Sequence, residues 1–86
     1  MNIYYLKKYR KAAKKEFRIR FINNEYNVMK YNYRINEWEF IHLTNEYVTP
    51  NLYVAKQTLA RERRKYILRL VKEMREINKN KELAKL

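Results

Sequence analysis

The chain of 86 residues contains no cysteine, glycine, serine or aspartate, and only one proline and one histidine. Without cysteine there is no disulfide framework, no thiolate metal site and no thiol nucleophile. Without glycine there is no phosphate-cradling loop of the GxGxxG or Walker type. Without serine, cysteine or aspartate, the usual sets of nucleophile, base and orienting group cannot be assembled. We therefore expect no enzyme, no cofactor and no small-molecule substrate.

His42, Glu37 and Glu39 remain as candidates for metal binding or acid–base chemistry. One histidine without cysteine or aspartate makes no convincing metal set, so we interpret His42 as structural and expect no metal site. The two glutamates share one face of a predicted strand. Their simpler role there is to form ion pairs with arginines on neighbouring strands of a sheet. The arginines in reach of that role are Arg18, Arg20, Arg34 and Arg63.

Long apolar runs are missing as well. No stretch approaches the ~18 residues that a membrane span requires, and the N-terminus lacks the apolar core of a signal peptide. Hydrophobic residues nevertheless make up 47% of the chain, which is enough for a folded core. We expect a single domain over residues 1–86, located in the cytoplasm, without a membrane partner.

Positive charge is the most prominent feature that is present. The net charge of +12 exceeds the magnitude of about 2–8 that keeps a small domain soluble. Residues 1–20 carry eight Lys or Arg against one Glu, and residues 61–86 carry ten against four. Residues 21–60 are nearly neutral. This segregation indicates a charged surface that meets polyanions.

Residues 3–16 predict an amphipathic helix. Leu6, Tyr9 and Ala13 recur at spacings of three and four, and the stripe continues to Phe17. The face opposite this stripe is purely cationic. It carries Lys7, Lys8, Lys11, Lys14 and Lys15.

Residues 17–43 predict three antiparallel strands. Phe17-Arg18-Ile19-Arg20-Phe21 alternates as a half-buried strand does. Asn23-Asn24 and Asn36-Glu37 are plausible turns, because asparagine tolerates left-handed backbone angles. These turns would separate strands at Tyr26–Ile35 and Trp38–Leu43. The alternative is a helix, since the apolar residues of this segment also fit a period of 3.6.

Thr49-Pro50 predicts the start of a long helix over residues 50–79, with threonine as N-cap and proline in the first turn. Residues 80–86 are expected to fray. The predicted fold is therefore α+β: a basic N-terminal helix, a three-stranded antiparallel meander and a long C-terminal helix. An all-α fold is the alternative.

The long helix carries a second basic cluster around "ARERRKYILR", in which Arg63 interrupts the apolar stripe and Leu68 lies among the basic residues. Arg63 must snorkel, pair with an acid or face a partner. The apolar residues Ile67, Leu70, Met74 and Ile77 step 3-4-3 like coiled-coil positions, which makes them a candidate face for a homodimer or another partner.

Aromatic residues make up 15% of the chain. Exposed rings beside basic residues can stack on unpaired bases. Tyr4, Tyr5, Tyr31 and Tyr33 are the candidates, although aromatic residues more often fill a small core.

Together these features predict a small, non-catalytic nucleic-acid-binding protein, with DNA favoured over RNA. A regulatory or accessory role in a phage or other mobile element fits the A/T-rich codons of its commonest residues. The alternative is an interaction module whose basic surface docks an acidic host protein or ribonucleoprotein, for example as an inhibitor. The predicted nucleic-acid contacts are Lys7, Lys8, Lys11, Lys14, Lys15, Arg18, Arg20, Arg61, Arg64 and Lys65.

Overall fold

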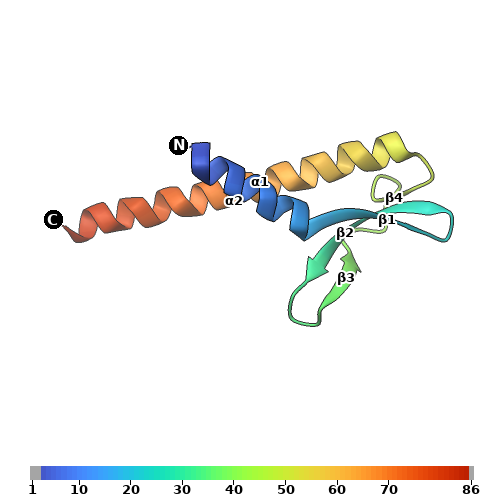
Figure 1. The fold of residues 1–86 in the computed structure, drawn as a ribbon, viewed down its shortest axis with the longest axis horizontal. Helices are drawn as coiled ribbons and strands as arrows, with labels where there is room; N and C mark the ends of the chain where they lie inside the picture. Colours follow the sequence, from blue (N-terminus) through green and yellow to red (C-terminus); the bar gives the residue numbers. More distant parts are fainter. Residues whose placement is uncertain (1–2, 86) are drawn as a thin grey trace.

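The computed structural model describes residues 3–85 of the chain, and the side chains from residue 5 onward. An N-terminal helix, three antiparallel strands and a long C-terminal helix follow one another (Figure 1). The predicted α+β fold is confirmed, and the all-α alternative is wrong. The strand pattern prevailed because β-branched and aromatic residues of this segment fill a pleated surface, with asparagines at the turns.

Helix α1 spans Ile3–Glu16 and packs against the long helix. Its predicted stripe is on the packed side, since Tyr9 and Ala13 are buried. The stripe continues into the first strand at Phe17, which is also buried and meets the ring of Tyr66 edge-on at 5.7 Å between centroids.

Strands β1 (Phe17–Ile22) and β2 (Glu25–Asn32) form an antiparallel hairpin. Its turn is made by Asn23 and Asn24, whose φ angles of 54° and 62° lie in the left-handed region. Asparagine reaches this region more readily than most residues, which explains how a chain without glycine makes a tight turn.

Strand β3 (Glu37–Phe40) pairs with the other edge of β2, after a turn in which Asn36 has a φ of 55°. It ends at Phe40, before the predicted end at Leu43, because the chain then leaves the sheet as a loop. The chain returns at Tyr47, whose carbonyl accepts a hydrogen bond from Val28, and adds the short strand β4 (Val48–Thr49) beside β2. Strand β4 was not predicted, since two residues show no periodicity.

Helix α2 spans Leu52–Ala84, about 50 Å at 1.5 Å per residue. The predicted cap was wrong: the Asn51 side chain, and not Thr49, accepts hydrogen bonds from the backbone of Tyr53 and Val54. Thr49 is part of β4, and its hydroxyl accepts from the Asn51 amide. The helix continues to Ala84, past the predicted end at residue 79, because this segment holds good helix formers and no breaker. Fraying of residues 80–86 stays a prediction.

One face of the sheet, the inner face, packs against α2. Val28, Tyr47 and the fully buried Ala55 of α2 form the core, with Ile19 and Leu59 packed around them. Ile19 and Val28 are opposite each other in the β1–β2 register. Because side chains alternate between faces, the residues between them belong to the other, outer face. The outer face carries Arg18, Arg20, Met29, Tyr31, Trp38 and Phe40.

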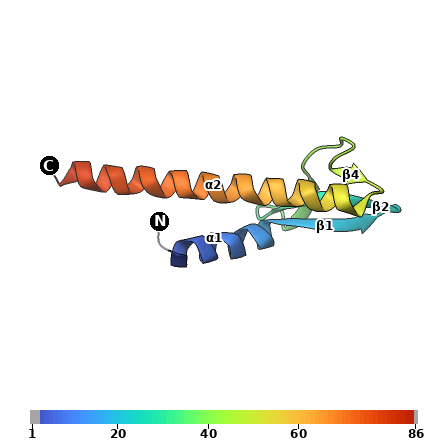
Figure 2. The same cartoon turned by 90° about the horizontal axis from the view of Figure 1, so that it is seen from above.

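The two helices lie differently against the sheet (Figures 1 and 2). Helix α2 runs along the sheet, whereas α1 leads away from it and lies beside the middle of α2. The C-terminal part of α2 extends past α1. This arrangement gives the molecule extents of 58 × 27 × 21 Å.

The contact at Ala55 provides a test of the packing. Because Ala55 has no exposed surface, we expect Ala55→Leu to lower the free energy of unfolding by about 1–3 kcal/mol through overpacking. The exposed Ala60, on the same helix, is the matched control. Ala60→Leu should change the free energy of unfolding by less than about 0.5 kcal/mol. Urea denaturation of both variants measures this, and equal effects would contradict the packing described.

Candidate nucleic-acid interface

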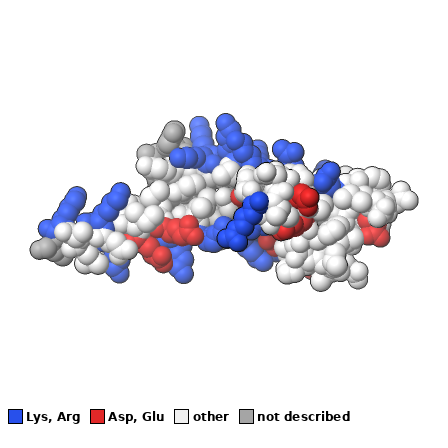
Figure 3. Space-filling view, turned by 90° about the horizontal axis from the view of Figure 1, so that it is seen from below, with Lys and Arg blue, Asp and Glu red and all other residues white. Residues whose placement is uncertain are grey.

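The five lysines of α1 form one exposed face, which we call the lysine face: Lys7, Lys8, Lys11, Lys14 and Lys15. It points away from α2, because the opposite stripe of α1 is the packed one. Within residues 3–85, none of these lysines forms an ion pair. Figure 3 shows Lys and Arg side chains gathered along the edge of the molecule that holds α1 and the adjoining sheet. A cation face of this kind attracts polyanions.

Arg18 and Arg20 lie next to α1 in the chain, and both are exposed on the outer face of the sheet. Their predicted exposure is confirmed. The Arg18 guanidinium lies over the ring of Trp38, with 5.4 Å between its central carbon and the ring centroid. This contact orients one of the two arginines.

The second predicted basic cluster is divided by the fold. Arg61 donates a hydrogen bond of 2.6 Å to Glu46, and this bond is the main reason that the pKa of Arg61 is raised. Lys65 lies 3.6 Å from Glu62. Both cations thus have carboxylate neighbours, which weaken their attraction for an external anion.

Arg64 lies on another side of α2, where it lines a groove between the two helices. We call this the arginine groove. Arg10 of α1 and Arg63 and Arg64 of α2 surround a volume of about 260 Å³. The remaining lining is apolar, and the described residues contribute no carboxylate to it. The apolar residues are Leu6, Ala60, Ile67 and Leu68.

Arg10 is a basic residue of this groove that was not among the predicted contacts. On a helical wheel it falls between the apolar stripe and the lysine face, so the pattern assigned it to neither. That border position was the available signal, since a residue there faces the seam between two packed helices. The groove also explains Leu68, which is 61% exposed and forms part of the lining.

Arg63 interrupts the apolar stripe of α2, and its guanidinium donates a hydrogen bond to the backbone. Its Nη2 donates to the carbonyl of Phe17 at 2.8 Å, while its buried Nε has no hydrogen-bond partner among the described residues. Burial, and then the nearby charge of Arg18, lowers the pKa of Arg63. An anion in the groove would relieve this repulsion between cations.

The candidate oligomer face is only partly free. Ile67, Leu70 and Met74 are half-buried, and Ile77 is 50% exposed. Ile67 lines the arginine groove beside α1. The first residue of the 3-4-3 pattern therefore belongs to a groove within the chain. Pairing of two copies through the remaining residues stays a prediction.

The two glutamates of β3 lie on the inner-face side, since they are opposite Lys30 and Asn32. Glu39 accepts a hydrogen bond of 2.7 Å from the Asn32 amide. The expected pairing with arginines was wrong, because Arg18 and Arg20 occupy the outer face. In the described part of the chain neither glutamate forms an ion pair.

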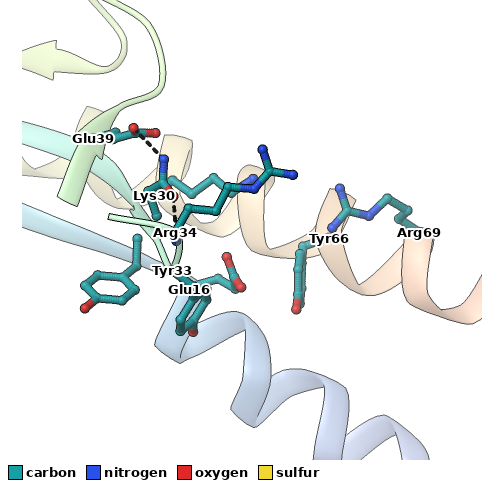
Figure 4. A pocket seen from close by; sticks show the side chains of 9 residues that line it. Glu16, Lys30, Tyr33, Arg34, Glu39, Tyr66 and Arg69 are labelled. Atoms are coloured by element: carbon teal, nitrogen blue, oxygen red, sulfur yellow. Dashed lines mark hydrogen bonds between the residues drawn. The ribbon is translucent and has the colours of Figure 1, made fainter. Parts of the chain in front are cut away.

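Glu39 borders an open pocket of about 420 Å³ (Figure 4). Lys30 and Arg34 come from the strands and the turn, Glu16 from the end of α1, and Tyr66 and Arg69 from α2. Charges of both signs surround this pocket, so it lacks the uniform positive field of the arginine groove. The pKa of Tyr66 is raised, mainly by burial.

His42 packs against Tyr47, with 4.9 Å between ring centroids. Over residues 3–85, no three His, Cys, Asp or Glu side chains come together as a metal ion would require. The same residues include no helix that is both long and apolar enough to cross a membrane.

Comparisons of the chain with models of known families, with curated proteins and with solved structures find no significant similarity. The function must therefore be inferred from the residues themselves.

Tyr47 provides a test through pH. Burial and a hydrogen bond to the Glu62 carboxylate raise its pKa above the usual value of about 10. A raised folded-state pKa means that the stabilising contribution of the hydroxyl is complete below pH ~10 and is lost as the pH rises through the folded value. We expect Tyr47→Phe to cost about 1–2 kcal/mol at pH 8 and clearly less at pH 11. Chemical denaturation of both proteins measures this, and a cost independent of pH would contradict it.

Proposed function

We propose that this protein is a small, non-catalytic nucleic-acid-binding protein, with DNA as the favoured ligand. The observation that carries the proposal is the lysine face: five exposed lysines on one side of α1, without acidic neighbours that form ion pairs with them in the described chain. A surplus of charge on one face gains nothing for folding, and it costs some stability through self-repulsion.

Phosphates of the nucleic-acid backbone fit this face for a physical reason. Nucleic acid carries condensed counterions, and each lysine or arginine that replaces one releases it to solution. Affinity then depends on clustered charge rather than on a particular motif. Arg18 and Arg20 extend the cluster onto the sheet, and the arginine groove offers a further phosphate position.

The biological setting that we propose is regulatory or accessory work for a phage or other mobile element, in the cytoplasm. The small size and the A/T-rich codons of the commonest residues support it. We also retain the proposal of a homodimer through α2, because many DNA-binding proteins are two-fold symmetric.

Replacing the lysine face tests the proposal directly. We expect the fivefold Lys→Gln variant at residues 7, 8, 11, 14 and 15 to lose about four to five units from the slope of log affinity against log salt on duplex DNA. The matched control replaces four exposed lysines of α2 and the exposed lysine at its C-cap, and so has the same net charge. Its positions are Lys56, Lys72, Lys79, Lys81 and Lys85.

Fluorescence anisotropy of labelled duplex and single-stranded DNA and of duplex RNA, over a salt series, provides the readout. Equal losses in the two variants would show that only net charge matters and would remove the lysine face as a site. Weak binding of the parent protein to every nucleic acid, together with tight 1:1 binding to an acidic protein, would favour an interaction module instead.

A single pair of arginines tests the groove. Arg61 and Arg64 are on the same helix, but Arg61 pairs with Glu46 whereas Arg64 lines the arginine groove. We expect Arg64→Gln to reduce the salt slope by about one unit and Arg61→Gln to leave it nearly unchanged. The same anisotropy titration measures both, and the reverse order would exclude the groove as a phosphate position.

A further inference from the structure

The outer face of the sheet carries aromatic side chains as well as arginines. In the β2–β3 register Tyr31 is opposite Trp38, and Met29 is opposite Phe40. Phe40 is 50% exposed, whereas Met29 is buried to 97% among its neighbours. Helix α2 packs on the inner face and α1 leads away from the sheet (Figures 1 and 2). In the described chain α2 therefore leaves this face uncovered, and Phe40 is exposed on it, whereas Tyr31 and Trp38 are half-buried.

The rings hold one another in place. The centroids of Tyr31 and Trp38 are 5.2 Å apart at an interplanar angle of 67°, and Tyr33 meets Tyr31 edge-on at 4.9 Å. Arg18 lies over Trp38 from the neighbouring strand. An ordered group of rings on strands loses little conformational freedom on binding, which favours recognition of a flat ligand.

The charges on this face select the ligand. Arg18 and Arg20 are exposed on it, whereas Glu37 and Glu39 belong to the inner-face side. Glu25 reaches the outer face only at the end of the β1–β2 hairpin, opposite Ile22. A matching ligand is therefore both flat and anionic. Nucleotides with unpaired bases meet this requirement, since the base stacks and the phosphate pairs with arginine.

We propose that the outer face binds unpaired nucleic acid, with bases stacked on Phe40 and Trp38 and phosphates at Arg18 and Arg20. This inference rests on the proposed function and narrows it to a class of ligand. A duplex presents its bases edge-on within the stack, so a flat aromatic surface has nothing to stack on. The lysine face attracts both forms, whereas the outer face distinguishes them.

The single tryptophan makes the proposal measurable without a label. The protein is titrated with a 20-nucleotide single-stranded DNA, with the same sequence as a duplex, and with an abasic strand of equal length. We expect the single strand to change the Trp38 emission and to bind more tightly than the abasic strand. The duplex and the abasic strand should bind through charge and leave the emission nearly unchanged.

Variants separate stacking from charge. We expect Phe40→Ala to weaken single-strand binding about 5- to 100-fold without changing the salt slope or the duplex affinity. Phe40→Tyr, which keeps a ring, should restore binding. Tyr53→Ala removes another exposed ring, 68% accessible and on α2, and should have no effect. Thermal denaturation checks that each variant is folded.

The outcomes distinguish the two proposals. If single strand and duplex bind alike, the Trp38 emission stays constant and Phe40→Ala binds as the parent does, the outer face is not a stacking surface, yet the proposed function stands. If no nucleic acid binds, the proposed function fails and this inference fails with it. If Phe40→Ala instead dissociates a dimer and leaves single-strand binding unchanged, the face is an interface between copies, which also overturns the proposal.

Discussion

The contact between α2 and the inner face of the sheet determines which surfaces of this protein are available. Ala55 lets the helix approach Val28 closely, and Tyr47 closes the core from the loop side. A chain of this size buries one modest core, and here that core lies mainly between the inner face of the sheet and one stripe of α2. The lysine face, the arginine groove and the outer face are what remains.

Charge in this protein falls into two kinds. Arg61 and Lys65 each have a carboxylate within ion-pair distance. The lysine face, with Arg18 and Arg20, has none within ion-pair distance in the described chain. Arg63 is intermediate, since it donates a hydrogen bond to the Phe17 carbonyl, whereas its buried Nε finds no partner among residues 3–85. For stability alone, a well-packed apolar residue would serve at this position at least as well as such an arginine.

Much of the fold could be predicted from the sequence because its signals are local. The alternation from Phe17 to Phe21 gave the first strand and the exposure of its arginines, and the asparagines marked both hairpin turns. The cap at Asn51 and the strand at Val48 were missed, because Thr49 is used in strand pairing. That pairing depends on β2, more than twenty residues earlier in the chain.

The candidate sites were harder to predict, because each depends on register or on contacts between distant segments. Alternation along "EWEF" places Trp38 and Phe40 on one face, but only pairing with β2 decides whether that face meets α2 or solvent. Glu46 lies in a loop, and nothing in its sequence context indicates that it holds Arg61. The arginine groove brings together Arg10 and Arg64, which no local pattern connects.

The length of α2 has a consequence for its dynamics. Amides around Ala55 are enclosed by the sheet, so their hydrogens exchange with solvent only when the domain unfolds. Past Met74 the helix has no packing partner in the described chain, and its amides exchange when the helix end opens locally. One unbroken helix thus spans the full range of local stability, from a protected core segment to an end that opens by itself. A ligand that ordered this end would lower the exchange of its amides and leave the core segment unchanged.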